Sequence, residues 1–326
     1  MKNFWQKLKK PFSVLAPMED VTDSVFRQII LNCGRPDVFF TEFTNTDGLM
    51  SKGRDKIIRR LKFNENEHPI VAQLWGNTPE NYIQSAKLLV EMGFDGIDIN
   101  MGCPVRKVVK RGECSGLIQN KNLAKELILA TIEGAAGIPV SVKTRMGYGF
   151  IETEEWVEFL LKLNIQALTL HGRLAKDMSK FPADWEEIGK AVKVRDKMFE
   201  GKAEKPVIIG NGDISSLQDL KEKSTKYGID GGMIGRGIFK DPFVFNPNRS
   251  IMDLTIQERL ELLLSHNKLF VQTWGETRFF AILKKFYKIY ISDFEGSVEM
   301  RNLLMRCESI EEVNLTVNSI LDNLQA

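Results

Sequence analysis

Eight short apolar runs, separated by segments of helical periodicity, occupy the chain between residues 13 and 235. The runs have the alternating or continuous apolar character of strands, whereas the segments between them place apolar residues at i, i+3 and i+4. Strands that alternate with helices imply βαβ units and a parallel sheet. Eight such units in about 230 residues fit a closed (β/α)8 TIM barrel better than an open doubly wound sheet. A dinucleotide-binding sheet would also carry Gly-x-Gly-x-x-Gly after its first strand, where this chain reads APMEDVTD.

The predicted strands are Ser13–Ala16, Val38–Phe43, Ile70–Leu74, Gly96–Met101, Pro139–Lys143, Ala167–His171, Val207–Asn211 and Gly231–Ile234. The predicted barrel helices include Asn81–Met92, Leu123–Ala135, Glu154–Leu163, Trp185–Val194 and Leu217–Tyr227.

Beyond Pro242 the strand signals stop, and the remaining chain has helical periodicity only. The helices expected there are Gln257–Trp274, Thr277–Ile291, Val298–Cys307 and Ile310–Leu324. In the second of these, Phe279, Leu283, Phe286 and Tyr290 form an apolar stripe suited to packing. We therefore predict two domains: a barrel over residues 1–248 and a small all-helical domain over residues 249–326.

Composition limits the possible settings of the protein. The formal net charge of +2 is too small to indicate a nucleic-acid partner by itself, so any such surface must come from local clusters of basic residues. The four cysteines show no Cys-x-x-Cys pair, so we expect no structural metal, and a reducing compartment fits best. The basic amino terminus lacks the apolar core of a signal peptide, and no apolar run approaches the length of a membrane span. A cytoplasmic protein without a membrane partner is expected.

The stretch GIDINMGCP places one thiol, Cys103, in a turn at the carboxyl end of the fourth predicted strand. A cationic loop follows it, with Arg106, Lys107, Lys110 and Arg111. In a barrel, the carboxyl ends of the strands carry the active site. A thiol among cations at this place suits a reactive group that acts on an anionic polymer, although most free cysteines are only small buried hydrophobic residues.

Nearly every other predicted strand also ends in a group that can donate or accept a hydrogen bond. Asn211-Gly212-Asp213 and Gly235-Arg236-Gly237 follow the last two strands, where such barrels commonly hold a phosphate. Gln73, Lys143 and His171 end three further strands and could line a flat heterocycle. Alternatives stay open, since Asn211 and Asp213 could cap a helix, the glycines could serve turns, and His171 could be a core residue.

Several longer motifs occur in a fixed order: LAPMEDVTDSVFR, VAQLWG, GIDINMGCPVRKVVKRGECSGLI, PVSVKTRMG, LTLHGR, VIIGNGDI and GGMIGRGIFKDPFVF. With these motifs the chain resembles the tRNA-dihydrouridine synthase family over nearly its whole length. A weaker match, RFFAILKKFYKIYI followed by MRNLL, is similar to the helical RNA-binding domain of that family.

The resemblance implies an FMN-binding barrel that reduces the C5–C6 double bond of specific uridines in tRNA to dihydrouridine, with NADPH (or NADH) as electron donor. Hydride would pass from flavin N5 to C6, and Cys103, which matches the catalytic cysteine of the family, would give a proton to C5. The family motifs place Asn100 and Arg145 near the target uracil. The remaining matched positions would bind the cofactor: Pro17, Met18 and Glu19 at the border of the flavin, Gln73, Lys143 and His171 at its ring, and Asn211, Gly212, Asp213, Gly235 and Arg236 at its phosphate. The expected partner is tRNA, and a monomer is expected.

Two departures from the family pattern stand out. Asp20 replaces the common glycine of the first motif, and Asp tolerates left-handed backbone better than most residues. The loop after the thiol reads Gly112-Glu-Cys114-Ser-Gly116, where smaller residues are usual. Cys114 could be a spare thiol, a packing residue or a redox partner of Cys103.

Three other functions are compatible with parts of the pattern. One is a flavin barrel acting on a free pyrimidine, similar to dihydroorotate dehydrogenase. Another is a Schiff-base lyase that uses Lys143, which ends a barrel strand. The third is a non-catalytic RNA-binding protein.

Overall fold

The computed structural model describes residues 3–325 and divides into two compact units. The first, the barrel unit, contains the residues up to Ser24 together with Pro36–Gly235. The second, the helical unit, contains Val25–Arg35 and the chain from Arg236 onward. The domain boundary expected at residue 248 stays a prediction.

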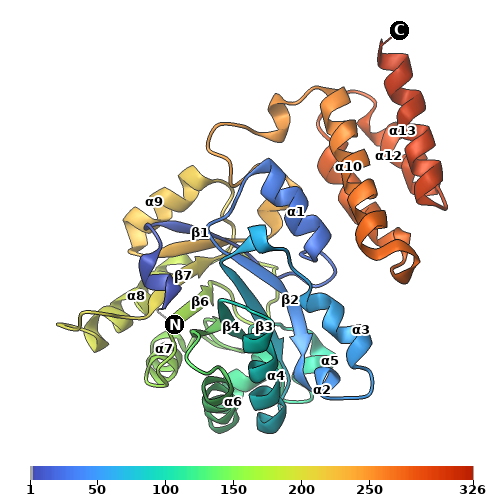
Figure 1. The fold of residues 1–326 in the computed structure, drawn as a ribbon. Coiled ribbons are helices and arrows are strands. Elements are labelled where there is room, and N and C mark those ends of the chain that lie inside the picture. Colours follow the sequence, from blue (N-terminus) through green and yellow to red (C-terminus); the bar gives the residue numbers. More distant parts are fainter. Residues whose placement is uncertain (1–2, 326) are drawn as a thin grey trace. The chain divides into compact units, whose positions relative to one another are not determined.

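Eight parallel strands form the sheet of the barrel unit, in the order β1-β8-β7-β6-β5-β4-β3-β2 (Figure 1). The strands are β1 (Phe12–Leu15), β2 (Phe39–Asn45), β3 (Ile70–Trp75), β4 (Gly96–Met101), β5 (Val140–Arg145), β6 (Ala167–His171), β7 (Val207–Asn211) and β8 (Gly231–Ile234). A parallel bridge between Val14 and Val38 joins β1 to the start of β2 and closes the ring. All eight predicted strands are confirmed, and so is the (β/α)8 fold.

The amino-terminal end of the barrel is filled by a cluster of large side chains. Trp5, on the short helix η1 (Phe4–Lys7), is fully buried against Phe12 and Phe40. Gly231 leaves the space that the Phe12 ring occupies, because a Cβ at Gly231 would lie 2.3 Å from that ring. This end is therefore a packed core, and the opposite end of the strands is left to present polar groups.

Helices alternate with the strands and surround the sheet (Figure 1). They are α4 (Pro79–Glu91), α6 (Lys121–Gly134), α7 (Thr153–Leu161), α8 (Trp185–Met198) and α9 (Leu217–Tyr227). Asn120, Asp184 and Ser216 cap three of them, each accepting a hydrogen bond from a backbone N–H of the first turn. Ser216 is thus the cap of α9, so the alternative in which Asn211 or Asp213 caps this helix is wrong.

Short helical elements missed by the periodicity analysis lie in the loops of the barrel unit. Between β2 and β3 they are α2 (Thr46–Leu49), α3 (Arg54–Ile58), η2 (Arg59–Leu61) and η3 (Glu65–Glu67), and between β4 and α6 they are α5 (Arg106–Val109) and η4 (Cys114–Gln119). They are too short to show a helical period in the sequence.

The helical unit contains α1 (Ser24–Cys33) from Val25 onward, η5 (Arg236–Phe239), η6 (Ile251–Asp253), α10 (Ile256–Trp274), η7 (Gly275–Thr277), η8 (Phe280–Phe286), α11 (Tyr287–Tyr290), α12 (Ser297–Arg306) and α13 (Ile310–Gln325). Phe26 of α1 packs on Phe286 and on the ring of His266. His266 is bonded to the Tyr290 hydroxyl at 2.9 Å, and burial lowers the pKa of His266 to about 3. None of the described helices could span a membrane.

The single helix predicted over Thr277–Ile291 is wrong. The segment is broken into η7, η8 and α11, and Arg278 has extended backbone between the first two. Leu283, Phe286 and Tyr290 are buried as expected, but Phe279 is 83% exposed. Tertiary packing of the 3₁₀ turn, in which residues three apart share a face, overrides the α-helical period read from the sequence.

Candidate functional site

The Cys103 turn is shaped by Asn100, a residue of β4 that lies three positions before the cysteine. The Asn100 Oδ1 atom accepts hydrogen bonds from the backbone N–H groups of Gly102 and Cys103, both at 3.0 Å. Its Nδ2 group donates to Gln73 Oε1 on β3 at 2.9 Å. Asn100 therefore fixes the thiol turn and links it to the neighbouring strand.

A buried carboxylate orients Gln73 in turn. Gln73 donates through Nε2 to Asp98 Oδ2 at 2.7 Å, and the Ser141 hydroxyl donates to Asp98 Oδ1 at 2.6 Å. Burial raises the pKa of Asp98 to about 6, against the effect of these two hydrogen bonds and of the Lys143 charge. Sequence reasoning missed Asp98, although a carboxylate within a strand buried along its whole length is rare without a role.

Lys143 lies beside this network and joins it to β7. Its Nζ donates to Asn211 Oδ1 at 3.0 Å, and Asn211 donates to the Met233 carbonyl at 2.8 Å. Burial and the nearby Arg145 lower the pKa of Lys143 to about 8, while Asp98 and Cys103 oppose the change. The predicted residues Gln73, Asn100, Cys103, Lys143 and Asn211 are thus brought together across four strands.

Cys103 is in contact with a second thiol. The fully buried Cys114 side chain is hydrogen-bonded to Cys103, and the Ser115 backbone N–H donates to the Cys103 carbonyl at 3.3 Å. The hydrogen bond from Cys114 lowers the pKa of Cys103 to about 6, against burial and with help from the Val105 backbone, Arg145 and Lys143. The same contact raises the pKa of Cys114.

Cys114 has a left-handed backbone, with φ of 51°. A side chain in that region costs free energy that glycine would not. The strained residue is thus the one whose side chain is hydrogen-bonded to Cys103.

Arg145 ties the thiol turn to the loop after β6. Its Nε donates to the Gly102 carbonyl at 2.7 Å, and its Nη1 donates to the carbonyls of Met178 at 2.8 Å and Leu174 at 3.2 Å. The side chain is buried, and this burial lowers its pKa to about 10. Arg145 is expected from the resemblance to lie near the uracil; in the structure its guanidinium is engaged with backbone.

A second buried arginine, Arg173, organises the residues after β6 and β7. It donates to His171 Nε2 at 2.9 Å and to Asp213 Oδ2 at 2.5 Å, while Asp213 also accepts from the Ala183 N–H at 2.8 Å. Because a guanidinium can only donate, His171 Nε2 is the unprotonated ring nitrogen. Sequence reasoning did not select Arg173, which only the folded loop brings to these partners.

The turn after β1 carries Pro17, Met18 and Glu19 beside the same end of the barrel. Glu19 Oε1 accepts two hydrogen bonds from Arg60, at 3.0 and 2.5 Å, whereas Glu19 Oε2 is buried without a partner among the described residues. Asp20 has a φ of 57° and so adopts the left-handed backbone expected where the motif commonly has glycine. A Cβ placed on Gly235 would contact Met18 at 3.7 Å.

Two residues predicted to bind the cofactor phosphate, Gly212 and Arg236, differ in their surroundings. Gly212 is closely packed, since a Cβ there would lie 2.6 Å from Ala183. Arg236 is exposed and belongs to the helical unit, in which it begins η5. Within the described residues no group of three His, Cys, Asp or Glu side chains could hold a metal ion.

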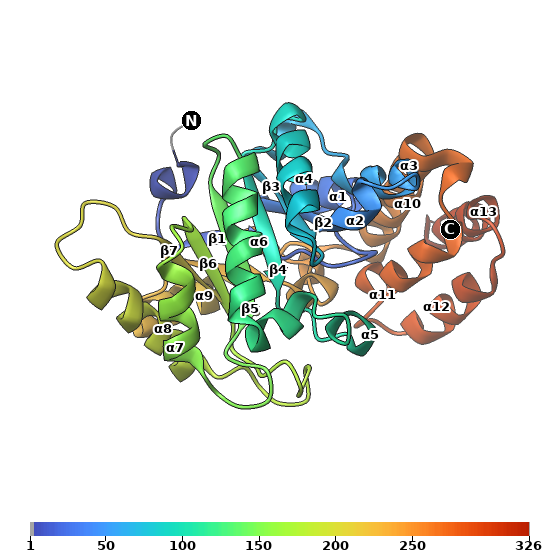
Figure 2. The ribbon, with the colours of Figure 1, turned by 90° about the horizontal axis from the view of Figure 1, so that it is seen from below.

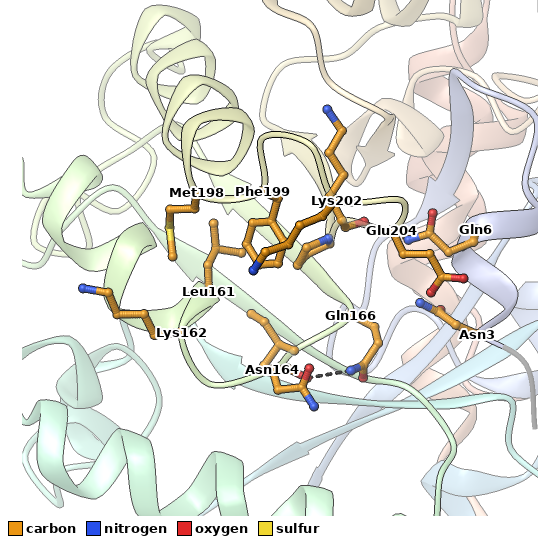
Figure 3. Close-up of a pocket in the computed structure, with 13 residues that line it drawn as sticks. Asn3, Gln6, Leu161, Lys162, Asn164, Gln166, Met198, Phe199, Lys202 and Glu204 are labelled. Carbon is orange, nitrogen blue, oxygen red and sulfur yellow. Dashed lines mark hydrogen bonds between the residues drawn. The ribbon is translucent and has the colours of Figure 1, made fainter.

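A cavity of about 370 Å³ lies at the other end of the barrel, between η1, the end of α8 and the loop before β6 (Figure 3). Asn164 and Gln166 lie within it, joined by the hydrogen bond drawn there. Because catalytic groups of TIM barrels lie at the carboxyl ends of the strands, this cavity is not the candidate site.

Comparisons with known proteins identify the family of this chain. The family model for dihydrouridine synthase (Dus) matches residues 14–325. The chain belongs to this family. A relative in Staphylococcus aureus, named as a probable tRNA-dihydrouridine synthase, is 44% identical over 328 residues, covering 100% of this chain and 96% of the relative. Probable tRNA-dihydrouridine synthase 2 of Bacillus subtilis is 44% identical over 327 residues, covering 99% of this Dus chain and 97% of its own.

Two solved structures resemble this Dus-family chain in fold alone. A histamine dehydrogenase from Rhizobium has a TM-score of 0.54 at 12% identity, covering 78% of this chain and 48% of that one. A 2-naphthoyl-CoA reductase has a TM-score of 0.55 at 11% identity, covering 72% of this chain and 49% of that one.

Proposed function

We propose that this member of the Dus family reduces the C5–C6 double bond of specific uridines in tRNA, with FMN as cofactor and NADPH as electron donor. The observation that carries the proposal is the thiol of Cys103, held in a turn at the carboxyl end of β4 by Asn100 and flanked by Lys143 and Arg145. A protonatable group at this place can supply the proton that saturation of a double bond requires.

The residues around the thiol fit a flavin. Gln73 and Lys143 would hold the polar edge of an isoalloxazine ring through amide and ammonium groups, and His171, Pro17 and Met18 would complete its surroundings. The buried, unpartnered Glu19 Oε2 fits a group that donates hydrogen bonds, such as a ribityl hydroxyl or the ring N–H. Asn211, Gly212, Asp213, Gly235 and Arg236 would hold the phosphate end. When bound and reduced, the flavin supplies hydride to C6 of the uracil.

The residues of the chain then donate the proton and position the uracil. Cys103 holds the proton at Sγ and gives it to C5, and Arg145 keeps the turn that carries this sulfur in place. Asn100 and Arg145 would lie near the uracil, which must leave the stacked RNA to reach the end of the barrel. The basic residues after β4, Arg106, Lys107, Lys110 and Arg111, would contact tRNA phosphates. We expect a cytoplasmic monomer.

Mass spectrometry of an unmodified tRNA transcript tests the proposal. The purified protein should be yellow, bleach when NADPH is added, and add two hydrogens to particular uridines. Reduction of free uracil or orotate but not of tRNA would instead indicate an enzyme of free pyrimidines. A colourless protein trapped by borohydride on a carbonyl substrate would indicate a lyase that uses Lys143.

The pKa of Cys103 gives a prediction on pH. Since the acid must be a thiol, kcat/KM for tRNA should fall as the pH rises through the pKa of Cys103, near 6 in the free enzyme. Cys114→Gly removes the hydrogen bond that stabilises the Cys103 thiolate, so this falling limb should move to higher pH. The measurement is the pH profile of dihydrouridine formation by both proteins. Coincident profiles would show that Cys114 does not tune Cys103.

A further inference from the structure

A cavity of about 480 Å³ lies in the barrel unit between the loop after β5 and the start of α6. Residues 118–122 line one side of it, and Tyr148, Phe150 and Glu152 line the other. Parallel strands place these loops, and the amino ends of the helices that follow, at the carboxyl end of the barrel. The cavity therefore lies at the same end as Cys103.

The aromatic side of the cavity is exposed but firmly held. Phe150 is 69% exposed. The loop that carries it is bonded to the loop after β6, because Ala175 N–H donates to the Gly147 carbonyl at 3.0 Å and Lys176 N–H to the Tyr148 carbonyl at 2.9 Å. Figure 2 shows these two loops beyond the ends of β5 and β6. Because the loop is bonded in this way, Phe150 presents its aromatic ring at a fixed place in the cavity lining.

The facing side of the cavity is polar. Gln119 and Asn122 present exposed amides, and Asn120 caps α6 through the Leu123 N–H at 3.2 Å. Lys121 is paired with Glu155 at 2.5 Å. Glu152 completes the lining with a carboxylate that accepts a hydrogen bond from the Tyr148 backbone. An aromatic face opposite amide and carboxylate groups has the chemistry that recognises a single-stranded base.

The cavity is close to the thiol along the chain. The helix η4 starts at Cys114, which contacts Cys103, and ends at Gln119 in the cavity lining. A 3₁₀ helix of this length spans about 10 Å. At the rise of about 3.4 Å per nucleotide of a B-DNA strand, that span corresponds to a few stacked nucleotides. A nucleotide near the reacting uridine could therefore reach the cavity.

We propose that this cavity binds an unstacked nucleobase that flanks the reacting uridine, with the base stacked on Phe150 and Glu152 accepting a hydrogen bond from its exocyclic amino group. The proposal rests on the proposed function for the identity of the RNA. Because Lys121 is paired with Glu155, the carboxylate of Glu152 is the remaining charge of the cavity lining and disfavours a phosphate there, so the base enters and the backbone stays outside. Uracil has no exocyclic amino group, which makes adenine, cytosine or guanine the expected occupant.

Binding of an unmodified tRNA transcript by Phe150 variants tests the stacking. Phe150→Ala should weaken binding about tenfold, as loss of one stacked base does, whereas Phe150→Trp should keep it. The slope of log Kd against log salt should be the same in both variants, because no charge is removed. Leu129→Ala is the matched control: Leu129 is also an exposed apolar residue of the barrel unit, at 46%, but lies on the outside of α6. Equal affinities of the wild-type protein and Phe150→Ala would overturn the proposal.

Titration with AMP, CMP, GMP and UMP tests the amino-group contact. The wild-type protein should bind the first three more tightly than UMP, and Glu152→Gln should reduce that difference. Equal binding of all four by the wild-type protein would overturn the assignment to Glu152. If Phe150→Ala weakens RNA binding while the wild-type protein forms no dihydrouridine, the cavity assignment stands and the proposed function fails.

Discussion

Replacement of Cys103 by alanine should slow dihydrouridine formation by a factor of about 100 or more, while the flavin stays bound. General acid catalysis contributes about 10²–10⁴ in rate, and Cys103 is the acid of the proposed reaction. None of the hydrogen bonds that join Gln73, Asp98, Ser141 and Lys143 to their neighbours uses the cysteine side chain. The measurement is the single-turnover rate of tRNA reduction by the flavin-loaded protein.

Two further variants make this result specific. Cys103→Ser keeps a hydrogen-bonding group of similar size, but a hydroxyl is a far weaker acid than a thiol, so it should be nearly as slow as alanine. Cys307→Ala removes a thiol of the helical unit and should react at the rate of the wild-type protein. Full activity of Cys103→Ala would exclude the acid role.

Arg145→Met should lower both the rate of tRNA reduction and the free energy of unfolding. The change removes the charged donor that serves the carbonyls of Gly102, Leu174 and Met178. Hydrogen bonds to charged groups contribute about 1.5–3 kcal/mol each, but the contributions of bonds made by one side chain do not add in full, so we expect the free energy of unfolding to fall by about 3 kcal/mol. Urea unfolding measures the stability, and the kinetics of tRNA reduction measure kcat and KM separately.

The two measurements separate two roles of Arg145. If its function is to hold the thiol turn, kcat and stability fall together, because the sulfur is no longer placed correctly. If it only binds the uracil, KM rises while the unfolding free energy is unchanged. Arg145→Lys keeps the charge but loses the planar fork, and should recover part of the stability.

The strands of the barrel could be predicted because a buried parallel strand is apolar along its length. The same pattern located Cys103, Lys143 and Asn211, since each follows or ends such a run. Local patterns do not reveal partners across the sheet. Asp98 lies at a polar position of an alternating strand, and that pattern does not show that it orients Gln73 from the adjacent strand.

Contacts made by loop residues could not be predicted from the sequence either. The contact between Cys103 and Cys114 depends on a left-handed residue in an aperiodic loop, for which the sequence carries no regular signal. Arg173 gains its role only when the segments after β6 and β7 fold against each other. The breaks within Thr277–Ile291 have the same origin, because packing of Leu283 and Phe286 decides the turn type.

The membership of α1 in the helical unit has a consequence for synthesis of the protein. Asn246, 213 positions later in the chain, bonds to the Cys33 carbonyl, and Phe26 packs on Phe286 still later. At translation rates of about 5–20 residues per second, α1 leaves the ribosome roughly 10–40 s before the first of these partners exists. During that interval its apolar face is available to chaperones, and a message truncated after β8 would yield a barrel with this helix permanently bare.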